Sequence, residues 1–360
     1  MVSTGLSSYV SAIRYQREAG LARRARAAVQ MARARLLYGI GPRYFCVFRL
    51  ADKPASLWRD YVIEFSDFKR RLAALTPREV HAIADDKVRF YLFCRDHGLA
   101  TIPIEFVVQR PEAERCPGIP TVSSAEEFRA ALDRCPDRLF FKPVDGVWGQ
   151  GAFGIRRLSD GCEFDGRRGT RDEAFRFVAS QLDGTRGYMA QPRVENHPAF
   201  RAVTSATGLA TVRIVTCRRG DTVRALYAVM KLTVGDNVTD NFHHGSTGNL
   251  VARVDLESGQ LGVAVGAVRT DWPVMADFVH HPDTGNAIEE FCVPHWVAAL
   301  QLVTDAHRAL PQLRATGWDV AITPAGPLLV ETNPRFGFDI VQIANDRGIR
   351  REVMEAVGMT

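Results

Sequence analysis

Short apolar runs separated by turn residues follow one another through the second half of the chain, and this pattern predicts strands joined in hairpins. Residues 211–217 and 223–233 flank the turn Arg219-Gly220-Asp221, and the segment VARVDLESGQLGVAV turns at Ser258-Gly259. GWDVAIT and PLLVET flank a third turn, Pro324-Ala325-Gly326. Strands joined by such short turns pair antiparallel.

Helices are predicted from their capping and breaking residues. One helix is expected to begin at Pro77 with Thr76 as its N-cap, to continue through Asp86 and Lys87, and to stop at Gly98. Other helices are expected at 11–38, from Ser123 or Ser124 to Leu132, at 172–182 and at 296–310, and other strands at 102–108, in LFFKPVDG, in GIRRL and at 188–190. Because helices and strands do not alternate regularly, the sequence predicts an α+β protein with largely antiparallel sheets.

Composition narrows the class of protein. The chain is 46% hydrophobic and 24% charged, as expected of a globular protein. It contains no run of about 18 apolar residues, so no membrane span is predicted. The start, MVSTGLSSYV, lacks the pattern of a secretory signal, and the seven cysteines include no C-x-x-C pair, so we expect reduced thiols and a cytoplasmic protein. A net charge of +5 suits an anionic substrate such as a nucleotide and does not indicate nucleic acid.

The predicted helix at 11–38 carries seven arginines and a single acid, Glu18. Its arginines fall all round the helix, whereas a membrane-surface helix separates its apolar and basic faces more cleanly. The pattern therefore favours a solvated or packing helix over a contact with an anionic membrane or a partner enzyme.

A glycine-rich loop, GVWGQGAFG, contains the spacing G-x-G-x-x-G at Gly149, Gly151 and Gly154. A dinucleotide site needs the last glycine to open a helix, but here the loop runs into a strand. Protein kinases have a similar loop followed by their lysine, whereas Lys142 precedes this one, and no H-R-D, D-F-G or Walker A motif occurs. The loop therefore indicates a flap whose backbone N–H groups approach phosphates, rather than a plain surface hairpin. Asp145 either orients this loop or is a turn residue.

Three oxygen-bearing side chains are predicted on two neighbouring strands near the C-terminus. Asp319 lies in GWDVAIT, and Glu331 and Asn333 lie two apart in ETNP, so that these two share one face of their strand. Two carboxylates and an amide oxygen suit Mg²⁺. Structural pairing at a sheet end is the alternative, which the upstream lysine and flap disfavour.

Taken together, these segments resemble the ATP-grasp superfamily, and most closely its sugar-transfer-associated branch, related to α-L-glutamate ligases. The similarity extends from about residue 80 to 345 and includes FFKPVDGVWGQGAFGI, ATVRIVT, VTDNFHHGSTGN, HPDTG, VPHW, GWDVAIT and ETNPRFGFDIVQ.

The resemblance implies an ATP-grasp fold in which two α+β lobes clasp ATP, preceded by a helical extension. The expected divisions are an Arg-rich extension at 1–80, an N-terminal part with the flap at 81–190, a C-terminal lobe with the metal site at 191–345 and a tail at 346–360. Lys87 and Lys142 would contact the α- and β-phosphates, with the loop glycines including Gly146. The Pro192 carbonyl and the Val194 N–H would read adenine; Gln191 stands where many relatives have Glu, and Glu195 or His197 would reach the ribose.

The resemblance also implies roles at the reacting groups. Asp319, Glu331 and Asn333 match the magnesium ligands, and Arg213 and Lys231 match basic positions near the γ-phosphate. Asn241 and the loop 245–248 match the acceptor side. By their place in this motif, His243 and His244 are the nearest candidates for a base, and the alternative is that each is an ordinary loop residue. Two departures, ETNPRFGFD and the histidine-containing loop, leave the acceptor undefined.

The predicted activity is ATP- and Mg²⁺-dependent ligation of a carboxylate to an amine through an acyl phosphate, with release of ADP and phosphate. The expected substrates are the carboxylate of an amino acid or peptide and an amine acceptor. The amine could be attached to a sugar. Two alternatives stay open: a kinase that phosphorylates a small molecule or sugar, and a non-catalytic nucleotide-binding partner of a glycosyltransferase. The oligomeric state is not predicted.

Overall fold

The computed structural model describes residues 6–14, 20–64, 66–116, 118–145, 151–205 and 208–359. Its α-helices are α1 (Leu6–Arg14), α2 (Leu21–Tyr38), α3 (Pro42–Val47), α4 (Asp67–Ala74), α5 (Arg78–Ala84), α6 (Lys87–Asp96), α7 (Ala125–Arg134), α8 (Arg171–Ser180), α9 (Trp296–Arg308), α10 (Phe338–Ala344) and α11 (Arg350–Val357). Short 3₁₀ helices are η1 (Leu50–Asp52), η2 (Ala55–Asp60), η3 (Pro198–Ala202) and η4 (His243–Gly245). The strands are β1 (Phe106–Val108), β2 (Thr121–Val122), β3 (Arg138–Pro143), β4 (Phe153–Leu158), β5 (Gly161–Phe164), β6 (Arg167–Gly169), β7 (Tyr188–Pro192), β8 (Thr211–Arg219), β9 (Thr222–Leu232), β10 (Leu250–Val254), β11 (Leu261–Ala267), β12 (Met275–Phe278), β13 (Ala315–Thr323) and β14 (Gly326–Asn333).

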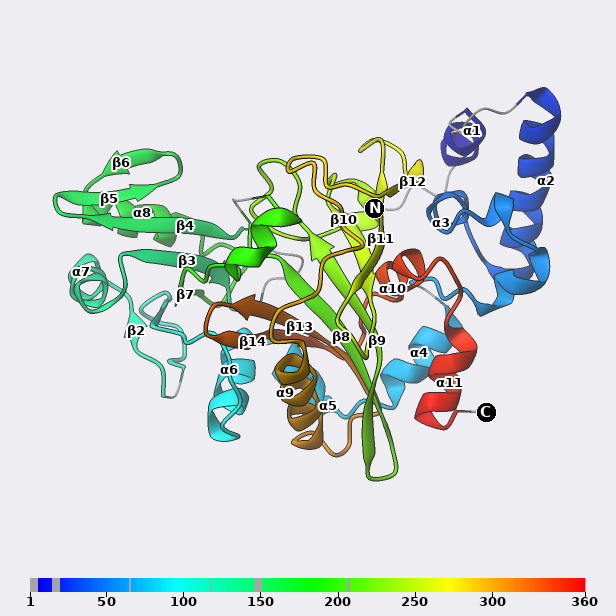
Figure 1. The fold of residues 1–360 in the computed structure, drawn as a ribbon. Coiled ribbons are helices and arrows are strands. Elements are labelled where there is room, and N and C mark those ends of the chain that lie inside the picture. Colours follow the sequence, from blue (N-terminus) through cyan, green and yellow to red (C-terminus); the bar gives the residue numbers. More distant parts are fainter. Residues whose placement is uncertain are drawn as a thin grey trace. The chain divides into compact units, whose positions relative to one another are not determined.

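The chain divides into two compact units (Figure 1). The larger unit contains Met1–Pro77, Asn196–Pro327 and Thr332–Thr360, and the smaller unit contains Arg78–Glu195 and Leu328–Glu331. The predicted α+β class is confirmed, and the strand pairing is antiparallel almost throughout.

The larger unit is built on a seven-stranded sheet of order β12-β11-β10-β9-β8-β13-β14. Because side chains alternate along a strand, the sheet has two distinct faces. Helix α9 covers the face that contains Thr216 and Trp318, with His307 among its buried residues. The opposite face, with Val215, Val229 and Val251, carries the main hydrophobic core.

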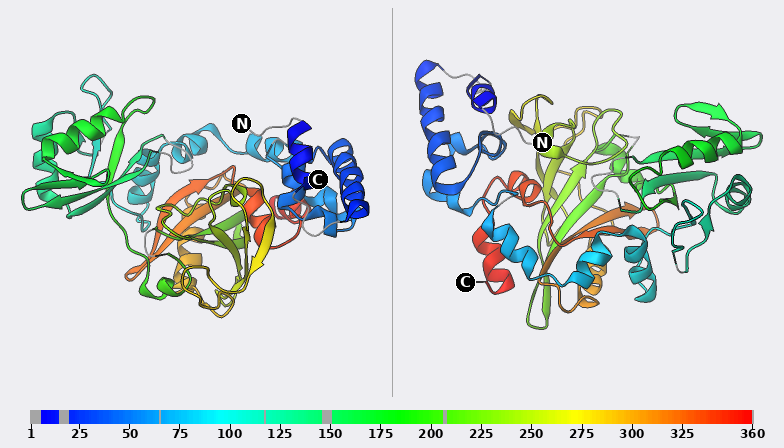
Figure 2. Two further views of the ribbon diagram at one scale, coloured as in Figure 1. Left: turned by 90° about the horizontal axis from the view of Figure 1, so that it is seen from above. Right: turned by 180° about the vertical axis from the view of Figure 1, so that it is seen from behind.

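This core is completed by helices from both ends of the chain. Phe45 and Trp58 from the N-terminal segment pack in the same cluster as Phe336 and Phe338, and all four side chains are buried. Helices α10 and α11 lie beside the N-terminal helices in each view (Figure 2). The N-terminal segment is therefore an integral part of the larger unit.

Two predicted helices are each divided in the structure. The segment 11–38 forms α1 and α2, with Gly20 in extended conformation at the N-cap of α2, and part of the prediction, 15–19, lies outside the described residues. The helix expected from Pro77 to Gly98 is wrong in its middle, because Asp86 begins a new helix. Its carboxylate accepts hydrogen bonds from the N–H groups of Val88 (2.9 Å) and Arg89 (3.1 Å), as an N-cap does. The predicted cap at Ser124 and the stop near Gly98 are confirmed.

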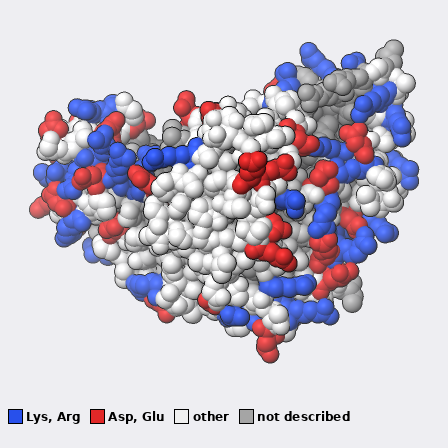
Figure 3. Space-filling view, viewed as in Figure 1, with Lys and Arg blue, Asp and Glu red and all other residues white. Residues whose placement is uncertain are grey.

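Helix α2 lies on the surface of the larger unit, and Lys and Arg side chains gather along the edge that it forms (Figure 3). Within the described ranges, no helix combines the length and the apolar character that crossing a bilayer requires.

The smaller unit has its own sheet, of order β2-β1-β7-β3-β4-β5-β6. Its separate core includes Phe106, Phe128 and Phe141, three aromatic side chains in mutual contact. Strands β3 and β4 pair antiparallel, with Phe140 opposite Gly154 and Leu139 opposite Ile155. Gly154, the last glycine of the predicted motif, therefore lies in a strand, as predicted, and opens no helix.

Candidate active site

Four charged side chains meet on the core-bearing face of the larger unit's sheet. Arg213 on β8 lies directly opposite Asp319 on β13. Its guanidinium holds both oxygens of this carboxylate, the second at 2.9 Å from Nη2. Lys231 on β9 donates to the same carboxylate over 3.1 Å. One aspartate is thus held by two cations from neighbouring strands.

Asp240, from the polar loop after β9, completes this cluster. Its Oδ1 accepts from Lys231 Nζ at 3.1 Å, and its Oδ2 accepts from the N–H of Thr211 at 2.8 Å and from the Thr211 hydroxyl. The exposed fractions are 8% for Arg213, 5% for Lys231, 8% for Asp240 and 4% for Asp319. We call these four residues the charge cluster. Its formal charge sums to zero, which is what burial demands of ionised groups.

The other two predicted magnesium ligands lie on β14. The Thr316 and Thr332 hydroxyls touch at 2.8 Å across β13 and β14, which puts both on the face opposite to Asp319. Glu331 and Asn333, the neighbours of Thr332, therefore share the face of Asp319. Their hard oxygen donors fit Mg²⁺. Among the described residues, no three His, Cys, Asp or Glu side chains form a metal-binding group by themselves.

The predicted acceptor loop has an unusual backbone. His243, His244 and Gly245 have φ values of 43°, 57° and 84°, all in the left-handed region that is costly for residues other than glycine. A side chain at Gly245 would lie 2.4 Å from the Ala267 Cβ, so only glycine fits there. Such strain is common at functional sites and indicates that the position of the two histidines matters.

His244 and Asp339 form a pair that the sequence did not predict. His244 Nε2 lies 3.1 Å from Asp339 Oδ2, and both side chains are about four-fifths buried, with exposed fractions of 18% and 20%. Burial opposes ionisation of Asp339, but the hydrogen bond and charge of His244, together with Lys69, lower the pKa of this carboxyl below its usual value. Asp339 is thus ionised and oriented toward the imidazole.

Tyr44, from the N-terminal segment, packs edge-on against His244 with ring centroids 5.1 Å apart. Its hydroxyl accepts from the N–H of Glu64 at 3.3 Å. Burial, reinforced by the charge of Asp339, raises the pKa of Tyr44, so this hydroxyl stays neutral. The N-terminal segment thus contributes directly to the surroundings of His244.

His243 is more exposed than His244, and burial together with the neighbouring imidazole lowers its pKa. The Asn241 carbonyl accepts from the Thr247 hydroxyl at 2.7 Å and from Asn249 Nδ2 at 2.8 Å. The main chain of Asn241 therefore helps to hold the loop.

Close packing connects the charge cluster with the histidine loop. A Cβ at Gly317 would lie 2.6 Å from Arg213 Cδ and 2.8 Å from Phe336 Cβ. Phe336 stacks on Phe338 with a centroid distance of 4.2 Å, and Asp339 follows. These contacts run along the same sheet face, so the charge cluster and the His244–Asp339 pair belong to one region of the larger unit.

In the smaller unit, Lys142 lies on β3, at the start of the glycine-rich segment. Gly151 has φ of +73°, and a Cβ there would lie 2.6 Å from the Tyr188 hydroxyl, so this position requires glycine. Gly154 lies in β4 opposite Phe140. Gly146 and Gly149 lie outside the described residues.

Lys87 follows the cap Asp86 and is fixed by its own N–H, which donates to the Val144 carbonyl at 3.0 Å. Burial lowers the pKa of Lys87, against the opposing charges of Glu331, Asp145 and Asp86. Asp145 accepts from the Thr185 hydroxyl. Lys87 thus lies near acids, one of which, Asp145, also holds the loop around Thr185.

At the end of β7, the predicted adenine-reading residues follow one another along the chain. Gln191 is buried, and its Nε2 donates to the Ile102 carbonyl at 2.9 Å, a bond that an ionised glutamate would not form. Pro192 pairs with Leu139, and Val194 is half-buried. Glu195 is exposed, 3.9 Å from Arg138.

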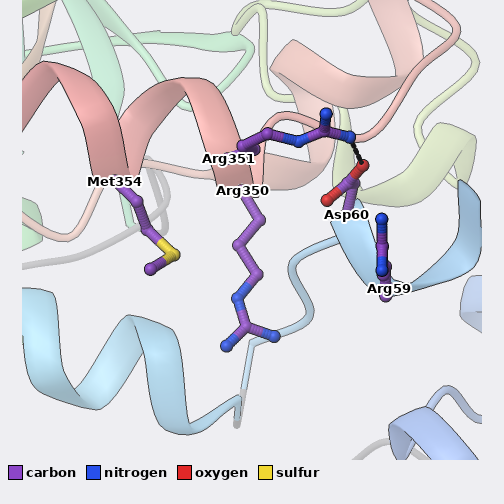
Figure 4. A pocket seen from close by; sticks show the side chains of 5 residues that line it. All are labelled: Arg59, Asp60, Arg350, Arg351 and Met354. Carbon is purple, nitrogen blue, oxygen red and sulfur yellow. Dashed lines mark hydrogen bonds and ion pairs between the residues drawn. The ribbon is translucent and has the colours of Figure 1, made fainter. Parts of the chain in front are cut away.

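A hollow of the larger unit is lined by Arg59, Asp60, Arg350, Arg351 and Met354 (Figure 4). Arg351 donates to Asp60 at 2.7 Å, so part of its charge is neutralised internally. The hollow shares no residue with the charge cluster or with the predicted ligands.

Comparison with known proteins gives a family. A family model described as sugar-transfer-associated ATP-grasp matches residues 67–358. No curated protein matches this chain. Similar solved structures include an ADP complex of N5-carboxyaminoimidazole ribonucleotide synthetase (11% identity, 83% of this chain, 60% of that chain, TM-score 0.45). A biotin carboxylase from Campylobacter jejuni is also similar (11% identity, 82% of this chain, 52% of that chain, TM-score 0.46). So is phosphoribosylamine–glycine ligase from Thermotoga maritima (14% identity, 79% of this chain, 57% of that chain, TM-score 0.45). The chain thus spans between about half and three fifths of these proteins' length.

Proposed function

Because this chain belongs to the sugar-transfer-associated ATP-grasp family, we propose that it is an ATP-dependent carboxylate–amine ligase that forms an amide through an acyl phosphate. The observation that carries the proposal is the charge cluster: Arg213, Lys231, Asp240 and Asp319 are paired with one another on one sheet face. Well-packed apolar residues would stabilise such a position as well or better, so a buried group of four charges is best explained by its chemistry.

In the proposed reaction, a substrate carboxylate oxygen attacks the γ-phosphorus of ATP, the bond to ADP breaks and an acyl phosphate forms. Arg213 and Lys231 stabilise the negative charge that develops on the transferred group. In the smaller unit, Lys87 and Lys142 bind phosphate oxygens together with main-chain N–H groups of the glycine-rich segment. Pro192 and Val194 provide the main-chain groups for adenine.

Asp319, Glu331 and Asn333 are the residues that would hold Mg²⁺. A bound ion of this kind would orient the phosphates and neutralise part of their charge. Since Asp319 already accepts from Arg213 and Lys231, these two cations hold its carboxylate in place.

The second half of the reaction needs a neutral amine, whereas most amines are protonated at neutral pH. We assign the uptake of that proton to His244. Asp339 accepts from the Nε2–H, which leaves the lone pair on Nδ1, the arrangement of a general base with an orienting carboxylate. The amine nitrogen then attacks the acyl carbon, the C–N bond forms, the C–O bond to phosphate breaks, and the departing phosphate takes the N–H proton that the nitrogen loses.

The first experiment measures ADP and phosphate release with Mg²⁺-ATP and amino acids offered singly and in pairs, with products analysed by mass. A ligase releases phosphate only when both substrates are present and yields a product lighter than their sum by one water. A product heavier by one phosphoryl group would instead establish a kinase. Binding of ATP without turnover by any carboxylate would favour a non-catalytic nucleotide-binding role.

A second experiment separates the two half-reactions by means of hydroxylamine, which is largely neutral at pH 7 and traps acyl phosphates as hydroxamates. The variant His244→Gln should lose about 10²- to 10⁴-fold in amide formation, the usual contribution of a general base, yet still form hydroxamate. The exposed His280 provides the matched control, His280→Gln, which should retain both reactions. Equal losses of hydroxamate and amide in His244→Gln would contradict the assignment of His244.

A further inference from the structure

Helix α2 uses one side to pack and presents the opposite side to solvent. Ala27, Met31 and Ala34 are buried against the larger unit. At about 100° per residue, Val29 and Leu36 fall on the opposite side. Their exposed fractions are 69% for Val29 and 83% for Leu36. Alanines 22, 25 and 32 fill the same stripe, and all are exposed.

Arginines flank this stripe on both sides. Arg26 and Arg33 border one side, Arg24 and Arg35 lie beyond the other, and Arg23 lies next to Ala34 on the packed side. The helix has no acidic residue. Among the described residues, Arg24, Arg26 and Arg33 form no ion pair, and Arg23 pairs with the exposed Asp52 at 2.9 Å. Figure 3 shows basic side chains along this edge of the larger unit.

The pattern differs from what the sequence alone favours. Counted over the whole segment 11–38, the arginines surround the helix, which indicates a solvated or packing helix. The structure removes the packed side from the count, and the outward side then consists of an apolar centre with basic borders.

We propose that the outward side of α2 docks this protein onto the surface of an anionic lipid bilayer. Val29 and Leu36 would enter the boundary between headgroups and acyl chains. The long arginine stems would extend along the apolar stripe, while their guanidinium groups contact lipid phosphates. Basic residues that lie close to the membrane surface strengthen binding to leaflets that contain anionic lipids. The absence of any acid on α2 is the feature that selects a uniformly anionic surface as the occupant. The proposal does not depend on the proposed ligase activity.

The test is flotation of the full chain with vesicles of phosphatidylcholine alone and of phosphatidylcholine mixed with phosphatidylglycerol. The protein should float with the mixed vesicles only, and less so as salt is raised. Arg26→Gln combined with Arg33→Gln should reduce partitioning by about 25-fold, since each basic residue contributes about 5-fold. Val29→Ser combined with Leu36→Ser should reduce it similarly without a change of charge.

Matched controls come from elsewhere on the surface. Val297 is 78% exposed on α9 and Arg168 is exposed on β6, so Val297→Ser and Arg168→Gln should bind as the unmodified chain does. Circular dichroism melting confirms that each variant is folded. Equal binding to both vesicle types, no binding to either, or undiminished binding of the α2 variants would overturn the proposal. Concentration-dependent self-association in light scattering that Leu36→Ser abolishes would overturn it as well, in favour of a contact between copies.

Discussion

Asp319 is the residue on which most contacts of the charge cluster converge, since Arg213 and Lys231 both donate to it. Two buried cations stay balanced only as long as two buried acids face them. Asp319 therefore has a structural role in addition to the proposed metal-binding role.

Asp319→Asn keeps the shape of this side chain and removes its charge, which leaves two cations facing Asp240 alone. Removing one partner of a buried ion pair typically costs about 3–5 kcal/mol, so urea unfolding should show a loss in that range. The control is Asp305→Asn, which breaks an exposed pair with Arg308 and should cost about 0–1 kcal/mol. Equal stability of the two variants would show that the cluster is more solvated than its burial indicates.

Lys142 permits a test of the phosphate-binding assignment in the smaller unit. Lys142→Ala should lose about 1.5–3 kcal/mol, the scale of a hydrogen bond to a charged group, which corresponds to about a 10- to 150-fold lower kcat/KM for ATP. Arg168→Ala, which removes an exposed cation from β6, should change little. Unaltered turnover and ATP affinity in Lys142→Ala would exclude a contact with phosphate.

At the scale of elements, α9 is fastened to the sheet by a directional chain of hydrogen bonds. Trp318 Nε1–H donates to Thr216 Oγ1 at 2.8 Å, and the Thr216 hydroxyl donates to His307 Nδ1 at 2.6 Å. His307 Nε2–H then donates to the Leu313 carbonyl at 2.9 Å. This chain requires a neutral His307, because a proton on Nδ1 would leave that nitrogen unable to accept from the Thr216 hydroxyl. Burial lowers the pKa of His307 to about 4, which agrees with that requirement.

The depressed pKa of His307 makes the stability of the fold depend on pH. The unfolded chain, with a histidine pKa near 6.5, binds a proton that the folded chain excludes, so stability is full above about pH 6.5 and falls as pH decreases toward 4. At pH 5 the contribution of this one group is a loss of about 2 kcal/mol relative to pH 7.5.

His307→Gln should remove this contribution, because glutamine does not titrate in the range. The measurement is the free energy of unfolding in urea at pH 7.5 and at pH 5, for both the unmodified chain and the variant. The variant should show the smaller difference between the two pH values, whatever its absolute stability. Identical differences would mean that His307 takes up a proton equally readily in the folded and the unfolded chain.

At the scale of the whole molecule, the sequence predicted those features that are encoded locally. The hairpins at Ser258-Gly259 and Pro324-Ala325-Gly326 and the cap at Ser124 depend on neighbouring residues, and all three are confirmed. The break before Lys87 was missed, because an aspartate inside a helical pattern does not reveal whether its carboxylate caps a new helix.

The candidate site, too, divides into residues that the sequence predicted and residues that it did not. Arg213, Lys231 and Asp319 were predicted by resemblance, and the structure brings them together on three neighbouring strands. Asp339 was part of a recognised motif but had no predicted role, and Tyr44 gave no signal at all. Their position beside His244 follows from how segments about 95 residues (Asp339) and about 200 residues (Tyr44) away along the chain fold together, which no local pattern records.

The integration of the N-terminal segment into the core can be measured with two adjacent residues. Trp58 is fully buried in the main core, whereas Leu57 beside it is 47% exposed. Trp58→Ala should lower the free energy of unfolding of the full chain by about 3–5 kcal/mol, and Leu57→Ala by much less. Similar small effects of the two changes in urea unfolding would show that residues before 67 fold apart from the main core.

Gln342 gives this integration a practical meaning. Its side-chain amide, 1% exposed, accepts from the Val62 N–H at 2.7 Å and donates to the Val62 carbonyl at 2.9 Å, as a strand neighbour would. The region shared with the family begins only at residue 67. Anyone who shortens the gene to that shared region therefore removes Val62, leaves a buried amide with two unmet hydrogen bonds and uncovers the aromatic core beneath it. Loss of soluble protein after such trimming would reflect the chosen start point and should not be taken as evidence about catalysis.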